Sequence, residues 1–131
     1  MSDKKRTPEE YISFWNGRLR GSLLDLAILY QAAFSTEKVY PYSISKKLAD
    51  EWGENLVPPL PTIYSAIDRL KLAGYIQTKS IAVGSRIQKT IELEEDGWKV
   101  LEMMIDEMKL FLKVFEYHEE DLDFDKARRK K

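Results

Sequence analysis

The chain has 131 residues, 44% of them hydrophobic, which is enough for one compact core. It has no cysteine, which excludes disulfides, thiolate metal sites and cysteine nucleophiles. The net charge of -1 conceals an uneven distribution of charge along the chain. Residues 62–91 carry five basic side chains and one acidic side chain, a net charge of +4, while residues 92–125 carry three basic and thirteen acidic side chains, and residues 126–131 add five basic ones. The segment 62–91 is therefore expected to attract a polyanion.

No apolar run approaches the roughly 20 residues of a membrane-spanning helix, and no apolar stretch follows the charged start, Met1 to Arg6. We therefore expect a soluble, cytoplasmic protein. The sequence shows no phosphate-binding glycine loop, paired-histidine motif or nucleophile elbow, so we expect no enzyme and no cofactor. The single histidine, His118, precedes an acidic run (119–121), but one histidine beside carboxylates is weak evidence for a metal. We expect a surface residue there and no metal site.

The first predicted helix begins at Thr7, which is followed by proline at the first helical position and by Glu10 three residues after the cap. This helix is expected to run to about Asn16 and to end at Gly17. A second helix is expected to open with Ser22 as its cap.

A third helix is predicted from a cap at Ser43 through Trp52, with Gly53 ending it. Pro58, Pro59 and Pro61 then form a stiff connector, because proline has no N–H to donate inside a helix. The next helix is expected over about 62–73, terminated by Gly74. Its apolar stripe consists of Ile63, Ala66, Ile67 and Leu70.

The segments 75–83 and 86–93 are rich in β-branched residues and are joined by Gly84-Ser85, which predicts a β-hairpin. A helical pattern then runs from about Glu95 to His118. Three helices followed by a hairpin predict a mainly α (α+β) winged helix-turn-helix, with a two-stranded wing and a long C-terminal helix. In such a unit the third helix lies in the major groove of DNA beside the hairpin, and the basic segment coincides with those two elements.

We expect four parts: an N-terminal extension with a short helix (1–18), a winged-helix DNA-binding domain (19–93), a C-terminal dimerisation helix (94–118) and a charged, flexible tail (119–131). The basic end of the tail is an alternative DNA arm, but the acidic run next to it would compete for it.

Three stretches carry a family resemblance. Leu19–Leu29 has a basic residue, a glycine and a serine before a leucine-rich run, Pro61–Leu70 is followed by Ala-Gly-Tyr-Ile, and Leu93–Gly97 reads Leu-Glu-Glu-Asp-Gly. These resemble the opening helix, the recognition helix with the first wing strand, and the entry to the last helix of the PadR family of transcription regulators, over roughly residues 19–115. The resemblance implies a dimeric repressor, in some members controlled by a ligand near the dimer interface.

The chain departs from the family pattern where DNA contacts are expected. Proline replaces the usual glycine at positions 41 and 61, Ser65 replaces a proline, and Glu94 replaces a threonine cap. The wing tip at 83–86 is short and less basic than is common.

Thr62, Ser65 and Arg69 are spaced i, i+3, i+7 and are predicted to enter the major groove, where arginine can grip guanine through two hydrogen bonds. The alternative is a solvated helix face with Thr62 as a cap. Tyr64 would reach a phosphate or anchor the helix to the preceding loop. The further predicted DNA contacts are Lys71 at the far end of the helix and Lys79, Arg86 and Lys89 of the hairpin.

Apolar residues in the last helix alternate at spacings of three and four, as in a coiled-coil seam, and too broadly for so small a domain to bury. They predict a two-fold dimer interface. The alternative is a helix folded back wholly on its own core. The predicted interface residues are Trp98, Leu101, Ile105, Met108, Phe111, Leu112 and Phe115.

Four aromatic residues could line a pocket for a small, flat aromatic effector: Tyr11, Phe14, Trp15 and Trp98. The favoured interpretation is that they pack in the core or in an interface. The predicted partners are thus double-stranded DNA and a second copy of the chain. The alternative function is a winged-helix module that binds protein and not DNA, since a fold does not fix its use. Retention on heparin or nonspecific DNA that falls with salt separates the two.

Overall fold

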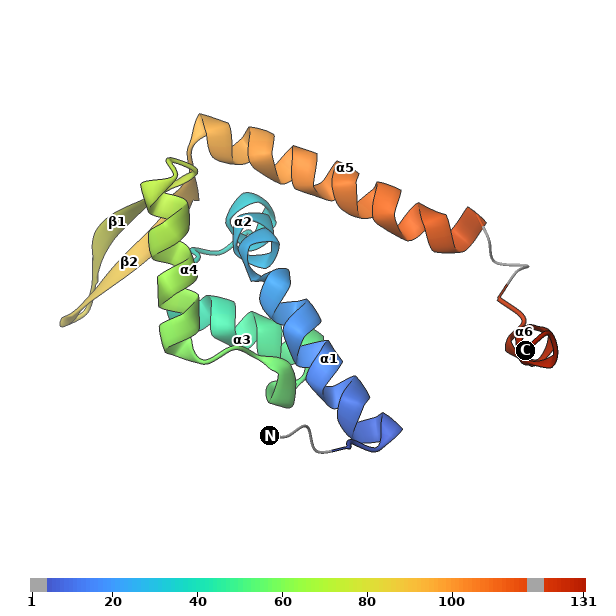
Figure 1. Ribbon diagram of the computed structural model, residues 1–131. Helices are drawn as coiled ribbons and strands as arrows, with labels where there is room; N and C mark the ends of the chain where they lie inside the picture. Colours follow the sequence, from blue (N-terminus) through green and yellow to red (C-terminus); the bar gives the residue numbers. More distant parts are fainter. Residues whose placement is uncertain (1–4, 118–121) are drawn as a thin grey trace.

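The computed structural model describes residues 5–117 and 122–131 (Figure 1). Its elements, in chain order, are α1 (Pro8–Ser22), α2 (Leu24–Phe34), α3 (Pro41–Trp52), the 3-10 turn η1 (Glu54–Leu56), α4 (Leu60–Leu72), β1 (Ile76–Val83), β2 (Arg86–Leu93), α5 (Glu95–Tyr117) and α6 (Phe124–Arg129). The two strands form an antiparallel sheet. The predicted winged helix-turn-helix with a two-stranded wing and a long C-terminal helix is confirmed.

Helix α1 begins as predicted, with a capping box in which Thr7 and Glu10 each bond the other's backbone N–H. It does not end at Gly17, and Ser22 does not cap α2. Glycine in a helix costs only about 1 kcal/mol relative to alanine, so α1 continues to Ser22, whose hydroxyl donates to the Arg18 carbonyl. Leu23 alone separates α1 from α2.

Two other helix starts differ from their predictions. Helix α3 begins two residues before Ser43, whose Oγ accepts from the Tyr40 N–H at 2.9 Å. Helix α4 begins two residues before Thr62, so Thr62 is a first-turn residue and not the cap. In both cases proline lies in the first turn, where its missing N–H costs nothing and its φ is already helical. The predicted ends at Gly53 and Gly74 are confirmed, and both glycines have positive φ.

The core lies where α2, α3, α4, the base of the wing and the start of α5 meet (Figure 1). Its most buried side chains are aliphatic and include Leu24, Ile28, Leu29, Ile44, Leu48 and Ile63. The Ile91 N–H donates to the Val39 carbonyl at 2.8 Å and so ties β2 to the segment before α3. The base of the wing is therefore fixed to the helices.

The predicted hairpin is confirmed, and it pairs Ile76 with Leu93 at its base and Val83 with Arg86 at its tip. Gly84 has a φ of 63°, which suits the first position of a two-residue hairpin turn. The wing thus projects away from the core beside α4 (Figure 1).

Helix α5 leaves the wing at a close backbone approach. The Glu94 N–H donates to the Tyr75 carbonyl at 2.9 Å, and a Cβ at the buried Gly97 would lie 2.0 Å from that same oxygen. Only the first half of α5 packs on the core, against α2 and β2. The predicted helix is confirmed from Glu95 to Tyr117, and His118 lies outside the described residues.

Within the predicted tail, residues 124–129 form the short helix α6, all of whose residues are exposed. Among the described residues, no helix is long and apolar enough to span a bilayer.

Candidate nucleic-acid interface

Helix α4 lies between α2 and the wing and turns one face to the core (Figure 1). Its four buried residues are Ile63, Ala66, Ile67 and Leu70, as predicted. Since residues seven apart share a side of a helix, the exposed residues fall into three rows. From Thr62 onward these are an α2-side row (Thr62, Arg69), an outward row (Ser65, Leu72) and a wing-side row (Tyr64, Lys71), with Asp68 between the last two.

The wing-side row faces a groove that α4 shares with β2 and the start of α3. Tyr64 lines a cavity of about 570 Å³ together with Arg86 and Lys89 of the wing. Lys71 and Lys89 line a smaller one of about 90 Å³ next to it, again with Tyr64. The structure therefore brings four of the predicted DNA contacts together in one cationic groove.

The α2-side row is engaged within the chain. The Arg69 Nη2 donates to Asp25 Oδ1 in the first turn of α2 at 3.0 Å, and both side chains remain partly exposed. Thr62 lies in the first turn of α4 and is exposed. The predicted contact between Arg69 and guanine stays a prediction, because in this structure the guanidinium is held against α2.

Lys79 lies apart from the groove. It pairs with Thr90 in the hairpin, and its Nζ lies 3.2 Å from Glu92 Oε1. Lys89 pairs instead with Ser80. Since successive strand residues point to opposite faces, Lys79 and Lys89 lie on opposite faces of the wing.

The sequence reasoning missed two residues of this surface. Tyr42, exposed in the first turn of α3, lines the larger cavity with Tyr40 and Tyr64. Asp68 lines the smaller cavity beside Lys71. Tyrosine spacing along the chain gives no sign of the first, because positions 42 and 64 meet only after α3 and α4 pack. Helical spacing alone does not show that Asp68 shares a cavity with Lys89 of the wing.

The predicted dimer seam divides along α5. Leu101 is only 2% exposed and belongs to its own chain's core, which leaves it almost no surface for a partner. Ile105 is half-buried against that core. Trp98, Phe111, Leu112 and Phe115 are exposed, and Met108 is half-buried.

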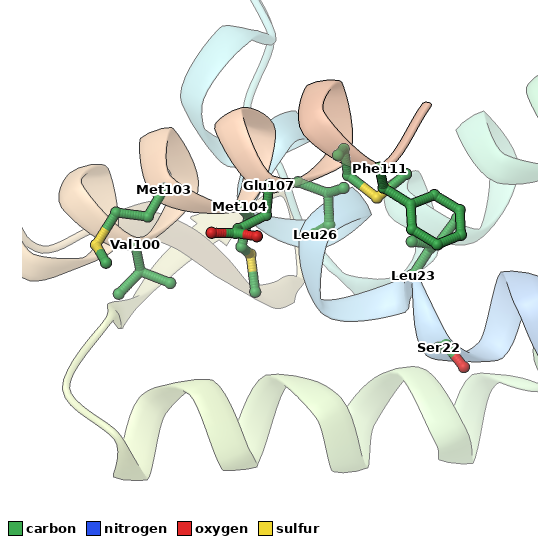
Figure 2. Close-up of a pocket in the computed structure, with 9 residues that line it drawn as sticks. Ser22, Leu23, Leu26, Val100, Met103, Met104, Glu107 and Phe111 are labelled. Atoms are coloured by element: carbon green, nitrogen blue, oxygen red, sulfur yellow. The ribbon is translucent and has the colours of Figure 1, made fainter. Parts of the chain in front are cut away.

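An apolar groove of about 560 Å³ opens between residues 100–111 of α5 and the junction of α1 with α2 (Figure 2). Figure 2 shows Val100, Met104 and Phe111 of α5 around it, with Leu23 and Leu26 on the other side. A second groove, of about 360 Å³, lies between α2, the end of α3 and α5, and Met108 lines both. Apolar side chains make up most of both linings, with Ser22 and Glu107 in the first groove and Gln31, Glu51 and Lys109 in the second.

The four aromatic residues predicted to share a pocket fall in two places. Tyr11, Phe14 and Trp15 are exposed residues of α1. The Tyr11 and Phe14 ring centroids lie 6.3 Å apart, and the Arg6 guanidinium lies 4.3 Å from the Phe14 centroid. Trp98, in the first turn of α5, lies edge-on to Phe34 of α2, with ring centroids 6.5 Å apart. Figure 1 shows the start of α5 far from the start of α1. One copy of the chain thus does not form the predicted aromatic pocket. No group of three metal-ligating side chains occurs among the described residues.

The fold is shared with solved structures of known regulators. A PadR family transcriptional regulator from Eggerthella lenta superposes with a TM-score of 0.70 at 22% identity, over 83% of this chain and 92% of that one. A transcriptional regulator from Clostridium thermocellum gives 0.66 at 25% identity, over 76% and 93%. The chain has the fold of the PadR-like transcriptional regulators.

A further PadR-like structure, from Bacillus subtilis, was solved in complex with operator DNA. It superposes with a TM-score of 0.55 at 21% identity, over 63% of this chain and 47% of that one. No family model matches the sequence, and no curated protein is significantly similar to it. The PadR resemblance of the three short stretches is thus confirmed through the fold.

Proposed function

We propose that this protein is a sequence-specific, double-stranded DNA-binding transcription regulator that acts as a homodimeric repressor. The observation that carries the proposal is the groove in which Tyr64 and Lys71 of α4 meet Arg86 and Lys89 of the wing. A helix fits the major groove, while cations beside it neutralise phosphates. The PadR-like protein solved with operator DNA supports this use of the fold.

The proposed contact surface consists of Thr62, Tyr64, Ser65, Arg69, Lys71, Lys79, Arg86 and Lys89. All eight side chains are exposed. The residues that line the groove would contact phosphates on the same side of the wing. Lys79 lies on the other face of the wing and contacts phosphate only if its ion pair with Glu92 opens. Repression follows from the PadR resemblance, and reporter expression from a promoter carrying the bound site tests its direction.

The homodimer is supported by two apolar surfaces left uncovered in one copy. No residue of α1 is buried, although a helix of 15 residues is marginal in water without tertiary support. The second half of α5 exposes Leu110, Phe111, Val114 and Phe115 in one patch. We propose that α1 and this half of α5 pair with those of a second copy in a two-fold interface.

Binding of the full chain to a random duplex library, followed by sequencing of the retained DNA, tests the function directly. We expect an enriched pair of half-sites about one helical turn apart, because two recognition helices related by a two-fold axis read symmetric sites. Nonspecific affinity is expected to fall as salt rises. A protein that retains no DNA and no heparin at low salt would instead support the protein-binding alternative.

A further inference from the structure

Side chains from three elements surround the larger cavity of the proposed interface. Tyr42 lies in the first turn of α3 and Tyr64 near the start of α4, while Arg86 and Lys89 come from β2. Both tyrosines are exposed, and so are both cations. Two phenol side chains and two positive charges thus border one space of about 570 Å³.

This set of side chains has the chemistry that recognises a phosphate group of the DNA backbone. A tyrosine hydroxyl donates a hydrogen bond to a phosphate oxygen. A guanidinium can bind two phosphate oxygens at once, and an ammonium acts on them as a point charge. Neither Arg86 nor Lys89 has an ion-pair partner among the described residues, so both can bind phosphate without breaking a contact of the free protein.

Pro41 fixes the position from which Tyr42 reaches the cavity. It is the first residue of α3, it is buried, and it lines both the larger and the smaller cavity. The proline ring holds the backbone φ near its helical value, so α3 starts rigidly at this point. The PadR pattern has glycine at this position, so a rigid start before Tyr42 is a feature of this chain.

The smaller cavity contains the one acidic residue of the basic segment. Among residues 62–91 only Asp68 is acidic, and it lies with Lys71 and Lys89 around a space of about 90 Å³. A carboxylate in this place offsets part of the charge of the lysines and repels an approaching phosphate. The groove is therefore more strongly cationic at its Tyr42 end than at its Lys71 end.

We propose that one phosphate of the DNA backbone binds in the larger cavity between Tyr42, Tyr64 and the two cations of the wing, and that Asp68 weakens phosphate binding at the other end of the groove. The proposal rests on the DNA-binding function proposed above and adds Tyr42 to its contacts. Because a phosphate contact carries no base sequence, Tyr42 fixes the position of the duplex in the groove and does not choose its sequence.

The first test uses duplexes of the sequence that the parent chain selects, with each phosphate replaced in turn by an uncharged methylphosphonate. Tyr42→Phe should bind the unmodified duplex about tenfold more weakly per half-site, the size of one hydrogen bond to a charged group. Tyr42→Phe and Arg86→Ala should both show a reduced loss of affinity at the same phosphate of each half-site, because groups that hold one phosphate are energetically coupled. Tyr30→Phe removes an exposed hydroxyl from α2 and should reproduce the parent's scan.

A Tyr42→Phe variant with the affinity and the scan of the parent would overturn the phosphate site. So would variants of Tyr42 and Arg86 that change the response at different phosphates. Unfolding of Tyr42→Phe should match that of the parent, since only an exposed hydroxyl is lost. A parent chain that retains no DNA would overturn the proposed function and this site with it, whereas a parent that retains DNA keeps the function standing whatever the scan shows.

The second test measures affinity for a duplex that lacks the selected sequence, over a salt series. Asp68→Asn should bind it about fivefold more tightly, the size of one charge–charge interaction in water. The slope of log affinity against log salt should steepen, because Lys71 can then neutralise a phosphate fully. Asp50→Asn removes the same charge from the last turn of α3, outside both cavities, and should change neither quantity. An Asp68→Asn variant with the parent's affinity and slope would overturn the role of Asp68.

Discussion

Arg86 and Lys89 illustrate what individual residues of this surface contribute. Both are exposed and line the groove that faces Tyr64. Neither has an ion-pair partner among the described residues, whereas Lys79 and Arg69 do. Their charges are thus available to phosphate without breaking a contact of the free protein.

We predict that Arg86→Ala and Lys89→Ala each reduce the slope of log affinity against log salt by about 0.9, the value of one phosphate contact. Lys99→Ala removes an exposed charge from the start of α5, outside both the groove and the half of α5 proposed to pair, and should leave the slope unchanged. Fluorescence anisotropy with a fixed duplex over a salt series measures this. Equal slopes for the parent and the three variants would show that the wing does not contact phosphate.

The pKa of Glu10 depends on the capping box at the start of α1. Its carboxylate accepts from the Thr7 backbone N–H at 2.8 Å, and this bond, followed by the Thr7 side chain and the nearby Arg6 charge, holds the Glu10 pKa below its usual value of 4.5. Because the folded-state pKa is depressed, the ionised form stabilises the cap. That contribution is present above the usual carboxyl range and is lost as pH falls through the folded-state pKa.

Carboxyl-resolved NMR of the parent chain should therefore show Glu10 titrating below 4.5. Thr7→Ala is expected to move the pKa of Glu10 upward, since it removes the hydroxyl but keeps the backbone donor. An unchanged titration in this variant would leave the backbone bond as the whole cause.

At the scale of elements, the junction of the wing with α5 depends on one glycine. Gly97 is buried in the first turn of α5, where a Cβ would collide with the Tyr75 carbonyl oxygen. That oxygen already accepts the Glu94 N–H, so it cannot move without breaking the bond that closes the hairpin. The contact between Gly97 and the Tyr75 carbonyl therefore sets the angle at which α5 leaves the wing.

We predict that Gly97→Ala destabilises the fold by about 1–3 kcal/mol, as overpacking of a close contact does, and lowers Tm by several degrees. Gly21→Ala is the matched control. Gly21 lies in α1 with no atom near its Cβ position, and alanine is the better helix former by about 1 kcal/mol. Thermal unfolding followed by circular dichroism compares the two variants. Equal Tm values would mean that the backbone at the start of α5 shifts to accept a Cβ at position 97 at little cost in stability.

At the scale of the whole molecule, the described structure has its polar contact surface at one end and uncovered apolar helices at the other (Figure 1). The wing and α4 lie far from the second half of α5. The proposed DNA contacts and the proposed dimer contacts are thus physically separate, and mutations should affect them independently.

We predict that the double variant Phe111→Glu with Phe115→Glu sediments as a monomer at micromolar concentration while the parent sediments as a dimer. The two rings form an edge-on pair at 5.8 Å on an exposed face, and two carboxylates there would be desolvated by a partner. Ile87→Glu, on the exposed wing tip, adds one such carboxylate away from the proposed interface and should remain a dimer. A monomeric parent would contradict the proposed interface.

The sequence by itself determined the order and nature of the elements, because local signals specify them. The proline and glycine positions bound α3 and α4, the β-branched runs around Gly84-Ser85 predict the wing, and the charge count locates its basic character. The error at Gly17 has a local cause as well: a single glycine costs a helix less than tertiary packing and good helix-forming neighbours supply.

Only the tertiary structure decided which side chains meet. Periodicity placed Leu101 in a dimer seam, but α5 turns that residue into its own core. It placed Arg69 with Ser65 on a base-reading face, yet Asp25, 44 positions earlier, holds the guanidinium. Helical spacing fixes which residues share a face of one helix, but the neighbouring elements determine what that face touches.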